Sequence, residues 1–169
     1  MPEMTSDIII KDLVSMLGIK AVLHHDDDTA LFLSDWHSRY HGKAYAVALP
    51  ETTDQVSALL AYADKHNIIV VPQGGNTGFM GGATPNASGH AILLSLRRMN
   101  RIRQIDKQNM SMTVEAGCIL QTLQDSADDA GLYFPLNLAA KGSCTIGGNL
   151  GTNAGGLIVL RYCTTRQLT

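Results

Sequence analysis

Two glycine-rich segments carry most of the residues that could do chemistry in this chain. The first, residues 72–78, reads Pro-Gln-Gly-Gly-Asn-Thr-Gly, and the second runs over residues 141–156. Glycine accepts positive φ angles and has no side chain to block approach, so such segments can turn several backbone N–H groups toward one point. An array of N–H groups suits a phosphate, and the second segment adds hydroxyl and amide side chains. The two segments therefore predict a phosphate site to which both contribute.

Neither segment matches the two best-known nucleotide-binding loops. No Gly-Lys-Ser/Thr follows the first segment, which excludes a Walker loop. The spacing Gly-x-Gly-x-x-Gly of the dinucleotide fingerprint is also absent.

The histidines offer a metal site as an alternative chemistry. The run from His24 to Asp28 holds two histidines and three aspartates, but consecutive side chains diverge, which favours a solvated loop. His37 and His41 stand four residues apart and could share a helix face, but the zinc pattern His-Glu-x-x-His is absent. We predict no metal site.

Three further features have a structural interpretation beside a functional one. Four arginines between residues 97 and 103 could bind phosphate or a partner, but without interleaved aromatic residues a solvated turn is favoured. Cys144 lies inside the second segment with no base nearby in sequence, which favours a small packing residue over a reactive thiol. Trp36 is interpreted as a core or interface anchor and not as a group that stacks on a ligand.

Strand and helix signals precede the first glycine segment. Residues 68–71 form an apolar run typical of a buried strand. Before it, Thr52 and Gln55 fit a capping box, and Val56, Leu59, Leu60 and Ala63 follow helical spacing. A strand over residues 45–49 and a helix over residues 7–17, capped by Ser6 and ended by Gly18, complete this half. The order strand–helix–strand predicts a parallel pair.

The second half has a different pattern. Strands are predicted over residues 91–95, 102–105 and 111–115, and a helix from Leu120 stops at Gly131. We expect these strands to be antiparallel and set the boundary between two subdomains near residue 90, giving residues 1–90 and 91–169.

Composition limits the function classes. The chain has 169 residues, 45% of them hydrophobic, and a formal net charge of −2, which gives no electrostatic case for nucleic acid. No apolar run approaches the roughly 20 residues of a membrane helix. The three cysteines include no Cys-x-x-Cys pair and are interpreted as free thiols in a reducing compartment. The start lacks the pattern of a leader peptide, so a cytoplasmic location is expected.

Four motifs in order carry a family resemblance. They are residues 72–78, Thr-Val-Glu-Ala-Gly at 113–117, Gly-Ser-Cys-Thr-Ile-Gly-Gly-Asn at 142–149, and Thr-Asn-Ala-Gly-Gly at 152–156. Together they resemble the FAD-binding domain of the vanillyl-alcohol oxidase or PCMH type. Within it the chain looks most like the FAD-linked 2-hydroxy acid dehydrogenases, above all those acting on D-2-hydroxyglutarate. The resemblance covers about residues 30–169.

The resemblance implies an α+β, PCMH-type FAD-binding fold, with a small parallel sheet and helices followed by part of an antiparallel sheet with helices. It implies that both glycine segments contact FAD. The contacts carried over from the first segment and its strand are Pro72, Gly74, Gly75, Asn76, Thr77 and Gly78. Those carried over from the second are Pro135, Gly142, Ser143, Thr145, Gly147, Gly148, Asn149, Thr152 and Ala154. A helix beginning near Gly147 would add its positive end.

The implied activity is oxidation of a D-2-hydroxy acid, such as 2-hydroxyglutarate, lactate or glycolate, with an electron acceptor as second partner. None of the six histidines lies in either glycine segment, so FAD is expected to be non-covalent. No catalytic residue is assigned, because in this family those groups lie in a C-terminal substrate domain, and we expect the chain to be an N-terminal part of a longer enzyme. The alternative is a non-catalytic FAD-binding fragment or subunit that packs against a partner chain; a homodimer is also considered.

One residue departs from the family pattern. Cys163 follows Arg161 and Tyr162 at a position where family members usually have glycine. A side chain there would strain a turn that needs a positive φ.

Overall fold

The computed structural model describes residues 5–169; residues 1–4, part of the stretch assessed for a leader peptide, lie outside the described range. The chain divides into two compact units, Met1–Arg98 and Met99–Thr169, each described separately below.

Unit 1 is built on a four-stranded sheet within the described residues. The strands are β1 (Val22–Leu23), β2 (Ala46–Ala48), β3 (Ile69–Gln73) and β4 (Ala91–Ser95), in the order β1-β2-β4-β3. β4 is parallel to both neighbours, and only β1 pairs antiparallel in this sheet. β2 and β4 are buried along their whole length, as their apolar sequences require in the middle of a sheet.

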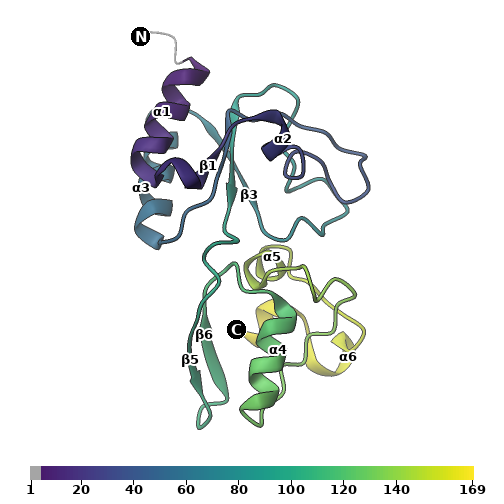
Figure 1. Cartoon of the computed structure of the whole chain (residues 1–169). Helices are drawn as coiled ribbons and strands as arrows, with labels where there is room; N and C mark the ends of the chain where they lie inside the picture. Colours follow the sequence, from purple (N-terminus) through teal and green to yellow (C-terminus); the bar gives the residue numbers. More distant parts are fainter. Residues whose placement is uncertain (1–4) are drawn as a thin grey trace. The chain divides into compact units, whose positions relative to one another are not determined.

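Two helices pack on unit 1's sheet. α1 (Ser6–Leu17) buries Ile9, Leu13 and Leu17 at helical spacing, and α3 (Thr53–Lys65) buries Leu59 and Ala63. Figure 1 shows the two helices side by side on the same side of the strands. Their buried side chains share one apolar cluster with residues of β1, β2 and β4.

The predicted helix ends are confirmed in part. The side chain of Thr52 accepts the N–H of Gln55, as a capping box requires, but the side-chain oxygen of Gln55 accepts from the N–H of Glu51 and not of Thr52. Gly18 ends α1 at φ 87°, as predicted, whereas Thr5 and not Ser6 occupies the position before its first turn. Leu60, predicted to face the core, is 45% exposed.

The predicted boundary near residue 90 differs from the structure. Residues 91–95 form the expected strand, but β4 lies between β2 and β3 in the parallel sheet, so the division falls after Arg98. The expectation that this strand belongs to an antiparallel part is wrong. Strand direction depends on partners distant in sequence, which a local apolar run does not specify.

Short elements outside the predictions join these parts. They are η1 (Ile19–Ala21), β1 and α2 (Asp26–Thr29). Residues 24–28 are predicted to form a solvated loop, but from Asp26 onward they form the single helical turn α2.

Unit 2 contains the predicted antiparallel strands, β5 (Ile102–Asp106) and β6 (Ser111–Val114), which pair with a register irregularity near Ile102. α4 (Leu120–Asp129) is the predicted helix and buries Leu120, Leu123 and Ala127; Gly131, just beyond it, has φ 76°. The remaining elements are α5 (Ile146–Gly151), α6 (Val159–Tyr162) and η2 (Thr165–Leu168). Among residues 5–169, no helix is long and apolar enough to cross a membrane.

Candidate functional site

The first glycine loop, residues 74–78, follows directly on β3. The last residue of that strand, Gln73, is buried, and its Nε2 donates to the carbonyl oxygens of Phe32 and Ala83, each at 2.9 Å. Its partner in the parallel register is Ser95, the last residue of β4. Gln73 therefore fixes the start of the loop to two flanking segments.

Asn76 anchors the middle of the same loop. Its φ of 54° lies in the left-handed region, which asparagine tolerates better than most residues. Its Nδ2 donates to the carbonyl oxygen of Ser34 at 2.7 Å and to that of Leu31 at 3.4 Å. The side chain of Asn76 thus holds the loop in place, which leaves its backbone for other contacts.

The backbone N–H groups of the first loop are not used by the described part of the chain. Within the described residues, none of the five N–H groups of residues 74–78 donates a hydrogen bond. A β-carbon added at Gly78 would meet nothing within 4 Å. Backbone N–H groups are normally paired, so five consecutive unpaired ones around a positive-φ residue form an array that can bind an anion.

Polar side-chain atoms at the base of the loop are also without partners. The Oε1 of Gln73 and the hydroxyls of Thr84 and Ser95 are buried and make no hydrogen bond to any described residue. Gln73 and Ser95 are register partners, and Ala83, which Gln73 contacts, precedes Thr84. This end of the parallel strands therefore has hydrogen-bonding capacity that the chain itself does not use.

Asp35 shapes the segment against which the first loop packs. Its carboxylate accepts the backbone N–H groups of Arg39 (2.6 Å), Tyr40 (2.8 Å) and His37 (3.4 Å). These bonds, that from Tyr40 foremost, hold the pKa of Asp35 below its ordinary value. Arg39 in turn donates to the carbonyl oxygen of Phe79 at 2.7 Å, just beyond the loop.

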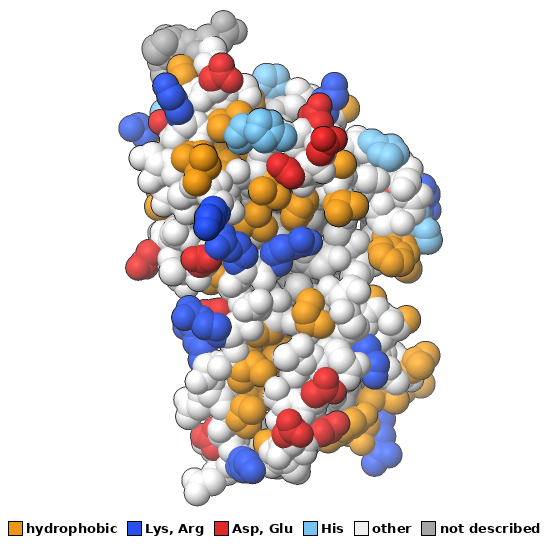
Figure 2. Space-filling model, viewed as in Figure 1, with side chains coloured by type: hydrophobic (Ala, Val, Ile, Leu, Met, Phe, Trp, Pro, Cys, Tyr) orange, Lys and Arg blue, Asp and Glu red, His pale blue; other side chains and the backbone are white. Residues whose placement is uncertain are grey.

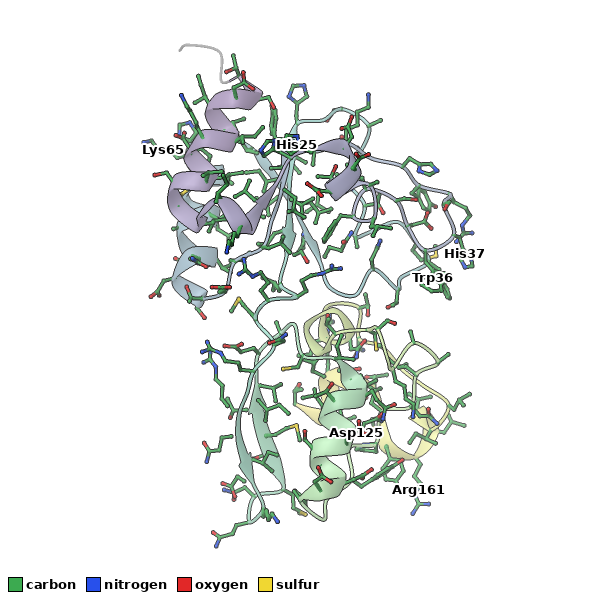
Figure 3. The ribbon with its side chains drawn as sticks, in the orientation of Figure 1. His25, Trp36, His37, Lys65, Asp125 and Arg161 are labelled. Atoms are coloured by element: carbon green, nitrogen blue, oxygen red, sulfur yellow. The ribbon has the colours of Figure 1, made fainter. Side chains whose placement is uncertain are left out.

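Trp36 lies at the outer edge of this segment. It is 65% exposed, and Figure 3 shows Trp36 and His37 pointing away from the strands of unit 1. The interpretation of Trp36 as a core residue is wrong; its role as an interface anchor stays a prediction.

The second glycine segment is held by contacts within unit 2. Thr145 is buried, caps α5 by accepting the N–H of Gly148 at 3.4 Å, and pairs with Ile119 in an isolated bridge. The N–H of Ile146 donates to the carbonyl oxygen of Cys118 at 2.9 Å. The predicted helix near Gly147 therefore exists, although it has only six residues.

Most of the predicted contacts in this segment already use their N–H groups internally. Five donate to carbonyl oxygens of unit 2, namely those of Ser143, Gly147, Asn149, Thr152 and Ala154. Gly148 donates to the hydroxyl of Thr145. Among the same set, the N–H groups of Gly142 and Thr145 have no partner in the described chain. The second segment therefore offers fewer free donors than the first.

Close packing explains why two positions of the second glycine segment are glycine. A β-carbon at Gly147 would lie 2.8 Å from the β-carbon of Ala116 and 2.9 Å from its carbonyl oxygen. One at Gly156 would collide with the carbonyl oxygen of Asn137. At Gly142 and Gly151 a β-carbon would meet nothing within 4 Å. Gly147 and Gly156 thus permit close approach of backbone segments within unit 2.

A buried carboxylate lies beside Ala116. The side chain of Glu115 is 1% exposed and accepts from Arg101 at 2.9 Å and from Arg103 at 3.2 Å. The hydrogen bonds from Arg101 foremost, then that from Arg103, lower the pKa of Glu115 from its ordinary 4.5 to about 2.

This cluster was missed in the sequence, where the arginine run is interpreted as a solvated turn. Arg101 lies just before β5 and Arg103 lies within it, while Glu115 follows the paired strand β6; two cations near a carboxylate at the end of the partner strand could have indicated an ion pair. Arg98 also has a carboxylate partner, Glu51. The side chains of Arg101 and Arg103 are 69% and 52% exposed, so the solvated interpretation holds for both, although each also pairs with Glu115.

No metal centre is found in the part of the chain that the structure describes: no group of three or more histidine, cysteine, aspartate or glutamate side chains could hold an ion. His37 and His41 lie in a loop and not on a helix face. The Nε2 of His41 lies 2.9 Å from the carbonyl oxygen of Ser38.

The cysteines are free thiols. Cys118 and Cys144 are buried, and burial raises the pKa of both thiols. This confirms Cys144 as a packing residue, since a thiol held protonated is a poor nucleophile. Cys163 is exposed and has φ 69° and ψ −170°, the strained turn that its departure from the family pattern predicts.

Comparison with protein families identifies one match. Residues 44–169 match the model of a family described as "FAD binding domain".

Curated relatives cover most of the chain. A probable mitochondrial D-2-hydroxyglutarate dehydrogenase of Oryza sativa subsp. indica is 42% identical over 148 residues, which make up 88% of this chain and 26% of that protein. The D-2-hydroxyglutarate dehydrogenase of Stutzerimonas stutzeri (strain A1501) is 34% identical over 97% of this chain and 35% of its own length. The chain thus spans roughly a quarter to a third of these relatives.

Solved structures share the fold. An alkyldihydroxyacetonephosphate synthase superposes with a TM-score of 0.84 at 17% identity, over 98% of this chain and 35% of that one. p-Cresol methylhydroxylase superposes with a TM-score of 0.73 at 22% identity, over 88% of this chain and 29% of that one. These matches confirm the predicted α+β, PCMH-type FAD-binding fold.

Proposed function

Because the chain belongs to the FAD binding domain family, we propose that it is the FAD-binding part of a flavin-dependent oxidoreductase that oxidises a D-2-hydroxy acid. When bound, FAD supplies a hydride acceptor at its N5 for the α-carbon of the substrate. Three substrates fit the proposal: 2-hydroxyglutarate, lactate and glycolate. Support for this class comes from relatives named D-2-hydroxyglutarate dehydrogenase at 42% identity and a putative D-lactate dehydrogenase of Schizosaccharomyces pombe at 43%.

The observation that carries the proposal is the first glycine loop. Its five unpaired N–H groups fit a diphosphate, which accepts several short hydrogen bonds from backbone donors. We propose that residues 74–78 hold the FAD diphosphate through these groups, with Pro72 setting the strand end.

The second segment has a different proposed role. Gly142 and Thr145 retain free N–H groups, and the exposed hydroxyl of Ser143 makes no hydrogen bond in the described chain. These three are the proposed polar contacts to FAD. The other predicted contacts, Pro135, Gly147, Gly148, Asn149, Thr152 and Ala154, would contribute shape and rigidity, since their donors are absent or already used.

We further propose that FAD is bound without a covalent link. None of the six histidines lies in either glycine segment. His90, for example, lies 2.7 Å from the hydroxyl of Tyr45. Denaturation in acid should release all flavin into the supernatant, and flavin that stays with the precipitate would contradict this.

The catalytic acid or base and any metal site are proposed to lie in sequence that the relatives have and residues 1–169 do not include. The relatives are three to four times longer than the aligned stretch. For the same reason, the electron acceptor would contact that additional sequence.

A second candidate function is a non-catalytic FAD-binding fragment or subunit that packs against a partner chain, including a second copy of itself. It is favoured by the two-stranded sheet of β5 and β6, whose outer edges have no strand partner in the described chain, and by the exposed Leu157 and Leu160. Light scattering separates the cases, because a dilute monomer argues against this candidate.

The location is proposed to be cytoplasmic. Its support is three free thiols, two of them buried, which suit a reducing compartment. Fractionation of the source cells is the test.

The experiment that tests the function uses the purified chain and, in parallel, the product of its complete reading frame. Both should take up FAD and show a flavin absorption spectrum. The complete product should then reduce an artificial acceptor with D-2-hydroxyglutarate, D-lactate or the achiral glycolate, and not with the L-enantiomer of 2-hydroxyglutarate or lactate. A flavin-loaded product that oxidises none of them overturns the substrate class. Absence of flavin binding in both proteins overturns the whole proposal.

A further inference from the structure

Arg97 is a cation of unit 1 that the chain leaves without a counter-charge. Within the described residues it forms no ion pair and no hydrogen bond, and it is exposed. Its guanidinium carbon lies 4.5 Å from the centroid of the Phe32 ring, a cation–π contact. Stacking uses the face of the guanidinium, so its in-plane N–H groups stay available for an acceptor.

The contacts of Phe32 locate Arg97 next to the first glycine loop. The carbonyl oxygen of Phe32 accepts from Gln73, the residue before the loop, at 2.9 Å. The neighbouring carbonyls of Leu31 and Ser34 accept from Asn76 within the loop. The segment that supports the guanidinium is therefore the one that supports the loop.

The register of β3 and β4 independently places Arg97 next to the first glycine loop. Gln73 and Ser95 are partners in the parallel pair β3–β4, and adjacent strands lie about 4.8 Å apart. Gly75 follows Gln73 by two residues, as Arg97 follows Ser95. Both positions thus lie beyond the carboxyl ends of neighbouring strands, at the same edge of the sheet.

The neighbouring arginines differ from Arg97. Arg98 pairs with Glu51, and Arg101 and Arg103 pair with Glu115. Figure 2 shows Lys and Arg side chains gathered on unit 1 around the place where β3 ends in Figure 1. Within the described residues, Arg97 thus differs from these arginines in having no carboxylate partner, and it follows the strand next to the one that leads into the loop.

We infer that Arg97 is a phosphate-binding residue of the FAD site, donating from its guanidinium to the diphosphate whose oxygens the loop N–H groups bind. This rests on the proposed function, since the diphosphate belongs to FAD. Arginine suits the role because its planar N–H groups match phosphate geometry and stay charged at all relevant pH values.

The test compares Arg97→Gln with the wild-type chain and with Lys65→Gln as a charge-matched control. Lys65 ends α3, just before β3 begins, so it lies at the end of the strand opposite to the loop; Figure 3 labels it on that helix. Dissociation constants for FAD and for riboflavin, which has no phosphate, are measured by flavin fluorescence at two salt concentrations.

Arg97→Gln should weaken FAD binding about 10-fold or more, the size expected for a lost charged hydrogen bond, and should reduce its salt dependence. Riboflavin binding should be unchanged, Lys65→Gln should stay within about twofold of wild type, and Arg97→Lys should restore part of the affinity. Melting temperatures without flavin separate these effects from a loss of folding.

The outcomes separate this inference from the proposed function. If wild type binds FAD and Arg97→Gln binds it equally well with the same salt dependence, the inference is overturned and the proposed function stands. If FAD and riboflavin weaken equally, Arg97 acts through the Phe32 contact and the phosphate role is overturned. If neither the wild-type chain nor the product of its complete reading frame binds FAD, the proposed function fails, and this inference with it.

Discussion

Cys163 combines an ordinary side chain with a backbone conformation that normally requires glycine. Its φ of 69° and ψ of −170° fall in a region that L-residues occupy only under strain, at a cost of about 1–3 kcal/mol. The N–H of Cys163 donates to the carbonyl oxygen of Val159 at 2.8 Å, which holds the turn at the end of α6. The strain is therefore fixed by local hydrogen bonding.

Replacing Cys163 with glycine should stabilise the protein. The free energy gained by releasing the backbone strain exceeds the entropic cost of ordering a more flexible glycine on folding. We expect the free energy of unfolding to rise by about 1 kcal/mol. The melting temperature should rise by about 2–4 °C. Cys163→Ser, which keeps the β-carbon, is the control and should show no rise. An equal rise in both variants would attribute the effect to the thiol and not to the backbone.

We expect Glu115 to make unit 2 less stable in acid. Its pKa is lowered from 4.5 to about 2 by the hydrogen bonds from Arg101 and then Arg103, so the folded state favours the ionised form. A group with a depressed folded pKa contributes stability that is present above its unfolded pKa and is lost as the pH falls toward its folded pKa. The contribution of Glu115 should therefore disappear between pH 4.5 and about 2.

Urea unfolding from pH 6 to pH 2.5 measures this loss. Glu115→Gln should be less stable than wild type at pH 6 and should show a smaller further loss below pH 4.5, because glutamine does not titrate. Asp129→Asn removes an exposed carboxylate that makes no ion pair in the described chain and should follow the wild-type profile. A Glu115→Gln profile parallel to wild type would rule out Glu115 as the source.

At the scale of elements, the start of α5 packs against the turn that precedes α4. Gly147 lies against Ala116, and the N–H of Gly147 donates to the carbonyl oxygen of Ala116 at 2.8 Å. The glycine that resembles a cofactor contact in the sequence thus has a packing role in the structure.

Gly147→Ala should therefore destabilise the protein by about 1–3 kcal/mol, because the added methyl group overlaps the backbone of Ala116. Gly151→Ala is the matched control in the same helix: it meets nothing within 4 Å and should be neutral or slightly stabilising. Thermal unfolding of the two variants decides the point. Equal stability would show that the packing at Gly147 can relax.

The elements differ in how far the sequence reveals them. α3 and the presence of a strand at β3 were predictable because Thr52 with Gln55 and the apolar run at residues 68–71 are local signals. The prediction that this strand is buried is wrong: β3 lies at the edge of the sheet, and only its last residue, Gln73, is buried. The parallel pairing of β4 was not predictable, because strand direction depends on partners far along the chain.

The candidate site shows the same limit. Both glycine segments were found from composition, but the sequence cannot tell a glycine with a free N–H, such as Gly74, from one whose N–H is paired, such as Gly147. The ion pairs of Glu115 depend on the register of β5 and β6, which no single motif contains.

At the scale of the whole molecule, two units each carry an apolar core and one glycine segment of the proposed cofactor site. A ligand that binds only the folded chain raises its stability, by about 2.7 kcal/mol at 100 times the dissociation constant. FAD should therefore raise the melting temperature, by an amount that grows with the logarithm of its concentration above the dissociation constant. Riboflavin at the same concentration should do so less, since the first loop contributes through the phosphates.

The proposed cofactor site is built on the five N–H groups of residues 74–78, which donate no hydrogen bond in the described chain. Amide hydrogen exchange with and without FAD observes these groups directly. Without FAD these N–H groups should exchange fast, because they have no partner among residues 5–169, while those of Gly147 and Asn149 should already be protected. With FAD, protection should appear at residues 74–78. Saturating FAD that leaves their exchange unchanged would contradict the central claim that this loop binds the cofactor.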